Sequence, residues 1–91
     1  MNDLIKQHFD AIKARGFINE STSLEAFMDK IDEEYSELLN AYADNWNNVP
    51  DRAMIHEAID LVAVIVNMLH FYRIDVAQAF RENIKYQESR I

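Results

Sequence analysis

Every residue from position 61 to position 66 (LVAVIV) is apolar, inside a longer segment whose apolar residues recur at helical spacing. A helix that is apolar all round has to be buried all round. Glu57 and Asp60 lead into this segment, and their spacing of three places them on one face of the predicted helix. Because burial of an unpaired carboxylate is strongly unfavourable, the chain must provide a partner for this acidic pair.

The composition fits a small globular domain and excludes several functions. With 49% hydrophobic and 27% charged residues, the chain has the balance of a folded protein, and its 91 residues predict a single domain, residues 1–91. A net charge of −7, without a cluster of basic residues, argues against nucleic acid as a partner. The absence of cysteine excludes disulfides and thiol chemistry.

We expect neither a targeting segment nor a membrane-spanning segment in this sequence. Its start, MNDLIKQHFDAIKARG, lacks the apolar core of a signal peptide. The longest apolar stretch is interrupted by Asn67 and His70, and we expect it to be too short to span a bilayer. We therefore expect a soluble cytoplasmic protein without a membrane partner.

The apolar spacing predicts four helices, at about residues 3–15, 24–43, 51–72 and 76–88. Gly16 is placed to end the first helix, and Thr22 with Glu25 forms a capping-box pattern before the second. The polar stretch ADNWNNVPD separates the second and third helices, and Asp75 is placed to cap the fourth. The expected fold is all-α, a four-helix bundle-like domain.

A second acidic pair occurs on the second predicted helix. Glu34 lies at helical spacing from apolar residues on both sides, and Glu37 lies on the flank of the same face. Both acidic pairs should then point into the bundle, where four carboxylates repel one another unless they take up protons or bind cations. Carboxylate-rich, all-oxygen sites favour Mg²⁺ or Mn²⁺. The expected metal ligands are Glu34, Glu37, Glu57 and Asp60.

Other interpretations stay open for the single motifs. A Glu-x-x-Glu pair is common on solvated helix faces, and the neighbouring Asp29, Asp32 and Glu33 are expected to lie on such a face. A di-iron bundle would need Glu-x-x-His on two helices, and no such motif occurs. The three histidines are therefore interpreted as packing or surface residues.

Several segments together resemble one enzyme family. EEYSE and EAID, separated by nineteen residues, resemble the acidic signature of MazG-like nucleoside triphosphate pyrophosphohydrolases, in the all-α NTP pyrophosphatase superfamily. RGF, YRIDVAQAF and KYQESR resemble the entry segment, the link into the last helix and the terminal stretch of such proteins. The similarity covers roughly residues 14–91.

The resemblance implies a MazG-type domain that hydrolyses a nucleoside triphosphate (NTP or dNTP) to the monophosphate and pyrophosphate, in nucleotide-pool housekeeping. It makes the four acids Mg²⁺ ligands, and bound Mg²⁺ would neutralise the triphosphate, hold it in line and lower the pKa of an attacking water. A carboxylate not fully engaged by metal would take the proton. Glu37 is the first candidate for this catalytic role, and Glu34 is the second.

The last predicted helix departs from the family pattern. Asn83 stands where similar sequences have lysine, and Gln87 stands where they have asparagine. Asn83, Gln87 and Arg90 share a helical face, so they are expected either to contact phosphate or to be ordinary solvated residues. Lys85 is a further phosphate candidate, although it points elsewhere on an ideal helix.

Three further positions are candidates for substrate contacts. Asn67 continues the acidic face two turns beyond Asp60, where it either orients a ligand or satisfies a partner in the core. Trp46, on a polar loop, and Phe17 are candidates to stack on the base. Phe27 is a weaker one, because it lies on the core stripe.

Three companion helices in so short a chain can cover only part of the third helix, so its uncovered side should pair with a second copy. The resemblance likewise implies a homodimer or homotetramer, with residues from a neighbouring chain completing the phosphate pocket. Two other functions stay open: a non-catalytic helical dimerisation module, and a regulatory domain that binds nucleotide without hydrolysing it. Metal-dependent release of pyrophosphate would separate the enzyme from both.

Overall fold

The structure of the protein is a computed structural model that describes residues 1–46 and 48–90. Its four α-helices are α1 (Asn2–Ala14), α2 (Leu24–Asp44), α3 (Arg52–Phe71) and α4 (Val76–Glu88). There is no β-strand within the described residues. The predicted all-α fold is therefore confirmed, and the predicted helix bounds hold to within one residue.

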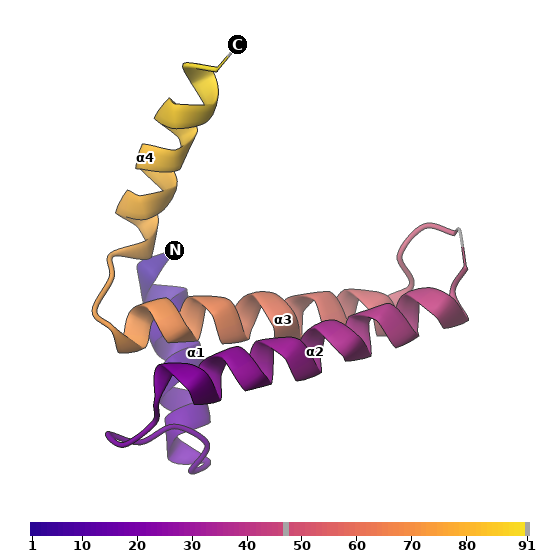
Figure 1. Cartoon of the computed structure of the whole chain (residues 1–91), viewed down its shortest axis with the longest axis horizontal. Helices are drawn as coiled ribbons and strands as arrows, with labels where there is room; N and C mark the ends of the chain where they lie inside the picture. The colour runs from indigo at the N-terminus through magenta and orange to yellow at the C-terminus, as the bar shows by residue number, and fades with distance from the viewer. Residues whose placement is uncertain (47, 91) are drawn as a thin grey trace.

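The helices α2 and α3 run side by side and form the centre of the molecule (Figure 1). Helix α1 lies across this pair at the end where α2 begins and α3 ends, whereas α4 extends away from the other three helices. At the same end the ring of Phe27 packs against that of Phe71, with their centres 5.2 Å apart. The buried apolar residues are Ile5, Ile18, Phe27 and Val76.

The ends of α1 and α2 are set by local chemistry. Gly16 follows α1 with a φ of 84°, a left-handed conformation that glycine adopts at little cost. Ser23 caps α2 by accepting a hydrogen bond from the Ala26 N–H at 3.0 Å. The predicted capping box at Thr22 is therefore wrong by one residue. Thr22 Oγ1 instead accepts a hydrogen bond from the Asn19 N–H at 3.0 Å and closes the preceding turn.

Asp75 caps α4, as predicted, and also joins α4 to the start of α1. Its Oδ1 accepts hydrogen bonds from the Gln78 N–H at 3.0 Å and from Asn2 Nδ2 at 2.8 Å. Asn2 Oδ1 in turn accepts a hydrogen bond from the Ala77 N–H at 3.0 Å. The residues of α4 beyond its first turn are all exposed, so α4 is held to the rest of the chain only at its beginning.

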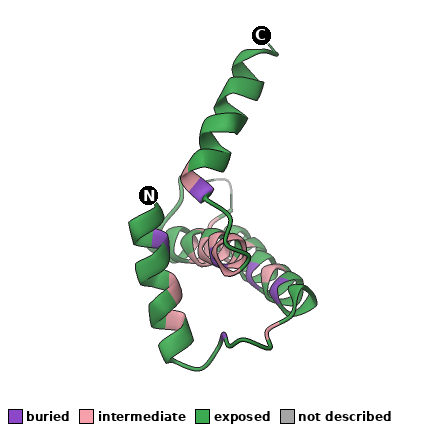
Figure 2. Cartoon of the chain, turned by 90° about the vertical axis from the view of Figure 1, so that its left-hand side faces the viewer, coloured by how far each residue is buried: buried purple, intermediate pink, exposed green. Residues whose placement is uncertain are grey.

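One chain leaves much of the apolar surface of α3 uncovered. Ile55, Ile59 and Val62 lie on one helical face and are 53%, 59% and 54% exposed. The accessible surface is 7166 Å², whereas a compact monomer of 10.7 kDa would expose about 5,500 Å². The radius of gyration, 15.0 Å, likewise exceeds the roughly 12 Å of a compact chain of this length. Figure 2 shows how few positions are buried.

Helix α3 also has the length and composition of a membrane-spanning helix. It has 20 residues and a mean hydropathy of 1.5 over its most apolar window. By these two measures the expectation that this stretch is too short to span a bilayer does not hold. However, α2 packs along α3, α1 crosses α3 at one end, and the polar side chains of Glu57, Asp60 and Asn67 lie on it. We therefore interpret α3 as the central helix of the fold.

Replacing Asp75 by alanine should lower the thermal midpoint by a few degrees, because α4 loses its cap and its bond to Asn2. The Asn2 bond is also the main reason that the pKa of the Asp75 carboxyl is lowered. A carboxyl group whose pKa is lowered by folding stabilises the native state above its unfolded pKa, and this stabilisation is lost as the pH falls through the folded pKa. The midpoint difference between the wild type and Asp75→Ala should therefore be full at neutral pH and shrink below the ordinary aspartate range.

Differential scanning calorimetry between neutral pH and about pH 3 measures this difference. Asp75→Asn is the matched control, because asparagine caps helices about as well as aspartate does. A difference between wild type and Asp75→Ala that stayed constant over this range would contradict the prediction.

Candidate active site

Glu34 lies on the buried face of α2, as its place on the apolar stripe predicts, and only 7% of it is exposed. Its Oε1 pairs with Lys30 Nζ, one turn earlier, at 3.1 Å. This pairing is the main reason that the pKa of Lys30 is raised. Glu34 Oε2 is buried and has no hydrogen-bond partner among the described residues. Half of the carboxylate is therefore satisfied and half is not.

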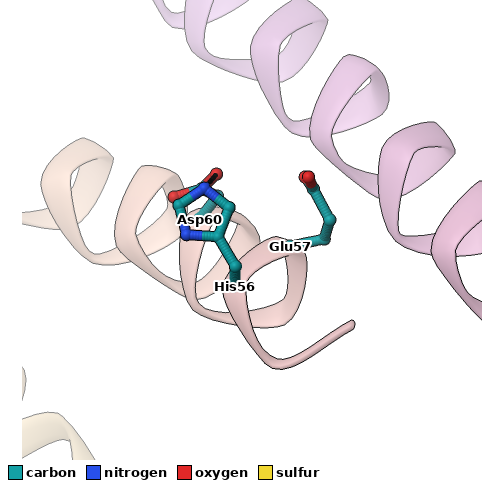
Figure 3. Close-up of side chains that lie close together, drawn as sticks. All are labelled: His56, Glu57 and Asp60. Carbon is teal, nitrogen blue, oxygen red and sulfur yellow. Dashed lines mark ion pairs between the residues drawn. The ribbon is translucent and has the colours of Figure 1, made fainter. Parts of the chain in front are cut away.

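Glu57 and Asp60 lie one turn apart on α3 but face different neighbours. Figure 3 shows the Glu57 carboxylate directed toward the adjacent helix, whereas the Asp60 side chain lies beside His56. The distance from Asp60 Oδ2 to His56 Nε2 is 3.2 Å. Glu57 Oε2, like Glu34 Oε2, is buried without a hydrogen-bond partner in the part of the chain that the structure describes. Each of the two helices thus contributes one unsatisfied carboxylate oxygen.

Glu37 links the two acidic pairs. Its pKa is raised above the ordinary glutamate range, mainly by a hydrogen bond of its protonated form with Glu34 and next by the negative charge of Glu34, and Glu57 on the other helix adds to both effects. A hydrogen bond made by the neutral form and a like charge at short range each disfavour the ionised carboxylate. Two clusters of side chains could each hold a metal ion: Glu33, Glu34 and Glu37 on α2, and His56, Glu57 and Asp60 on α3. Within each cluster, one possible ligand atom from every residue lies within 4.8 Å of the others.

These clusters fit a hard divalent cation. Mg²⁺ and Mn²⁺ bind carboxylate oxygens, and a cation would satisfy the buried oxygens of Glu34 and Glu57 and offset the repulsion on Glu37. Sequence reasoning did not single out Lys30 and His56, which pair with two of the four predicted ligands. Their spacing of four residues before Glu34 and Asp60 was the available signal.

A cleft of about 490 Å³ opens beside the acids, bounded by α1, α2, α3 and the α1–α2 connection. Its volume is in the usual range for small-molecule sites, roughly 300–1,000 Å³. Glu34 and Asp60 line the cleft, and Asn67 lines it further along α3. Arg15 and Lys30 are its cationic residues. Its apolar lining includes Ile12, Phe17, Ile18, Phe27, Ala63 and Val64.

The contacts predicted on the last helix lie apart from this cleft. All four residues are exposed, and none of them lines the cleft. Arg90 instead lies over the ring of Tyr86, with its guanidinium carbon 5.4 Å from the ring centre. Within one chain, therefore, four residues predicted to contact phosphate do not reach the cleft: Asn83, Lys85, Gln87 and Arg90.

The three aromatic candidates have different positions. Trp46 lies after the end of α2 against Tyr42, with ring centres 5.6 Å apart, and does not line the cleft. Phe17 does line it, and the Arg15 guanidinium carbon lies 4.8 Å from the centre of its ring. Phe27 also lines the cleft but is only 4% exposed, in keeping with its expected place in the core.

Replacing Glu37 by glutamine should raise the thermal midpoint of the metal-free protein at neutral pH, because it removes a repelling charge. An acid whose pKa is raised by folding destabilises the native state above that pKa, and this cost disappears below the unfolded pKa. The advantage of Glu37→Gln over the wild type should therefore shrink as the pH falls through the raised pKa and end within the ordinary glutamate range.

Thermal unfolding in the presence of a chelator, repeated across this pH range, measures the effect. Asp29→Asn serves as the control, because Asp29 is an exposed acid on α2 outside both clusters. Equal pH dependence in the wild type and Glu37→Gln would show that Glu37 does not experience the repulsion.

Comparison with known proteins assigns the family. The chain matches the family described as phosphoribosyl-ATP pyrophosphohydrolase over residues 1–86. It matches no curated protein and no solved structure. The matched family lies within the MazG-like all-α NTP pyrophosphatase superfamily, so the resemblance seen in the acidic motifs is confirmed. Because the match spans most of the chain, this protein belongs to the phosphoribosyl-ATP pyrophosphohydrolase family and is a pyrophosphohydrolase that acts on a phosphoanhydride of a nucleotide.

Proposed function

We propose that the protein hydrolyses the α–β phosphoanhydride of a nucleoside triphosphate with Mg²⁺, releasing the monophosphate and pyrophosphate. The observation that carries this proposal is the pair of buried oxygens without partners, Glu34 Oε2 and Glu57 Oε2, on neighbouring helices. A dimerisation module or a purely structural bundle has no use for two such oxygens, each of which weakens the fold. Glu34 lines a cleft of nucleotide size together with Asp60, which also supports a catalytic role.

The proposal assigns metal binding to the four acidic residues and proton transfer to one of them. Glu34, Glu37, Glu57 and Asp60 hold the metal, and Lys30 holds one oxygen of Glu34 at 3.1 Å. When bound, Mg²⁺ supplies positive charge that neutralises the triphosphate and makes a nearby water easier to deprotonate. Glu37 is the general base that we favour, because a carboxylate with a raised pKa accepts a proton more readily.

The matched family favours a second, narrower substrate. Phosphoribosyl-ATP is a nucleoside triphosphate whose adenine carries a further ribose phosphate, and cleavage at the same α–β bond releases pyrophosphate from it too. The extra phosphate needs a cation, and Arg15 is the cleft cation that makes no ion pair within the described residues. If phosphoribosyl-ATP is the substrate, Arg15→Ala should lower its kcat/KM more than that of ATP. Equal losses would favour a general nucleoside triphosphate pyrophosphohydrolase.

A panel of NTPs, dNTPs and phosphoribosyl-ATP, assayed with Mg²⁺, should yield monophosphate and pyrophosphate in equal amounts. Glu57→Gln and Asp60→Asn should reduce turnover by several orders of magnitude while the helical content stays unchanged, because metal binding loses a charged ligand. Asp29→Asn, which changes an exposed acid outside the clusters, should keep full activity. Product analysis by ion-exchange chromatography decides the cleavage site. Orthophosphate with a diphosphate, or full activity in both site variants, would refute the proposal.

We also propose that the working form is an assembly of two or more copies. The surface in excess of a compact monomer, about 1,700 Å², is of the order that each partner buries in an obligate dimer. The exposed apolar face of α3, at Ile55, Ile59 and Val62, lies among this surface, and Phe80 and Ile84 on the projecting α4 are 50% and 52% exposed. A second copy that covers these faces would also be able to bring its own α4 residues to the cleft.

Light scattering at micromolar concentration should give a mass of at least twice 10.7 kDa. Ile59→Glu should shift the protein toward the monomer and lower its thermal midpoint, since it places a charge in the apolar face. Val49→Glu is the matched control, because Val49 is 82% exposed and lies outside this face. A fully active wild type that scatters as a 10.7 kDa monomer would overturn the assembly.

A further inference from the structure

Three buried side-chain oxygens in the described part of the chain have no hydrogen-bond partner: Glu34 Oε2, Glu57 Oε2 and Asn67 Oδ1. A metal ion accounts for the first two, which are anionic. It does not account for the third, which is a neutral amide oxygen and lies two turns, roughly 10 Å, beyond Asp60 along α3. Asn67 is also among the most buried residues described, with 3% exposed. An unsatisfied polar atom at such a position requires a separate explanation.

The other end of the Asn67 amide is held by α1. Asn67 Nδ2 lies 3.1 Å from Nδ1 of His8, so the amide nitrogen donates a hydrogen bond to this ring nitrogen in the tautomer that carries no proton there. His8 is 59 positions away in the sequence, and it bridges α1 to α3 at this point. The contact fixes the rotation of the amide group. Because the nitrogen is engaged with His8, the oxygen is the atom left to meet another donor.

Both residues line the cleft that also contains Glu34 and Asp60. The apolar lining of the same cleft includes Ile12, Phe27 and Val64, and Val64 lies one turn before Asn67 on α3. The lining of the cleft therefore combines carboxylates and cations, which suit metal and phosphates, with apolar side chains and the unpaired amide oxygen of Asn67. The apolar side chains and this acceptor together suit a flat, largely apolar group that carries an N–H donor.

We propose that Asn67 Oδ1 accepts a hydrogen bond from an amino group on the nucleobase of the substrate, and that His8 is a positioning residue that holds the Asn67 amide for this contact. The inference rests on the proposed function, since it assigns the base end of the same cleft. Ribose hydroxyls lie nearer the phosphates than the base edge does, so the distance from the acids favours the base. Leaving the acceptor unpaired is unfavourable, and the site should therefore discriminate against bases that lack the donor.

The test compares substrates that differ only in this donor: ATP against purine riboside triphosphate, and CTP against the triphosphate of the pyrimidinone nucleoside that lacks the amino group. For at least one pair, the wild type should favour the amino-bearing substrate by about tenfold in kcat/KM, mainly through KM. Asn67→Ala should remove this preference. Asn40→Ala is the matched control, because Asn40 is an exposed asparagine on α2 outside the cleft, and it should keep the preference.

Two substitutions separate positioning by His8 from simple packing. His8→Gln retains an acceptor for Asn67 Nδ2 and should keep most of the preference, whereas His8→Phe fills similar space without an acceptor and should lose it. Circular dichroism confirms that each variant is folded, and the affinities of the wild type for AMP and purine riboside monophosphate give a readout without turnover.

The outcomes are distinguishable. If no triphosphate releases pyrophosphate, the proposed function fails. If pyrophosphate is released but the wild type shows no preference in either pair, or Asn67→Ala keeps it, the role of Asn67 is refuted while the function stands. If Asn67→Ala instead abolishes a preference for ATP over its 3′-deoxy analogue, the acceptor contacts the sugar and the base assignment is wrong.

Discussion

The burial of carboxylates between α2 and α3 is the constraint on which the rest of the structure depends. Helix α3 is too apolar to be stable in water alone, so it packs against α2, and this packing buries Glu34 and one oxygen of Glu57. Lys30 satisfies one oxygen of Glu34, but one oxygen on each helix stays without a partner in the described chain. The pKa of Glu37, which is itself exposed, is raised mainly by a hydrogen bond with Glu34 and by the charge of Glu34. A divalent cation would resolve all three effects, which is why we connect the packing of this pair to phosphoanhydride chemistry.

A second constraint is the shortage of chain to cover α3. Helix α1 crosses the pair at one end only, and α4 is tied down by its first turn and then leaves the domain surface (Figure 1). The link that sends α4 outward contains Arg73, whose φ of 61° is left-handed and would be adopted more readily by glycine. The apolar faces and the polar side chains of α4 are therefore both presented outward, which is the geometry expected of a subunit rather than of a compact monomer.

The sequence predicted the helices well because their signals are local. Apolar spacing set the four helices, Gly16 and Asp75 marked two ends, and the position of Glu34 on an apolar stripe indicated its burial. Ser23 and Thr22 carry nearly equivalent capping groups, so only the geometry of the turn decided between them. The contact between His8 and Asn67 joins residues far apart in the chain, and nothing in the local pattern of either one predicts it. The direction of α4 depends on the conformation of the four linking residues 72–75, which helix periodicity does not determine.

The most direct test of the central claim is a titration of Mn²⁺, as a spectroscopic substitute for Mg²⁺, followed by electron paramagnetic resonance of the free ion. The wild type should remove Mn²⁺ from solution in a saturable way, and added pyrophosphate should leave this binding intact or strengthen it. Glu34→Gln and Glu57→Gln should each weaken the binding by at least about tenfold, because each removes a charged oxygen ligand. Wild-type protein that leaves Mn²⁺ free, or binding unchanged in both variants, would mean that the buried carboxylates serve some purpose other than holding a metal ion.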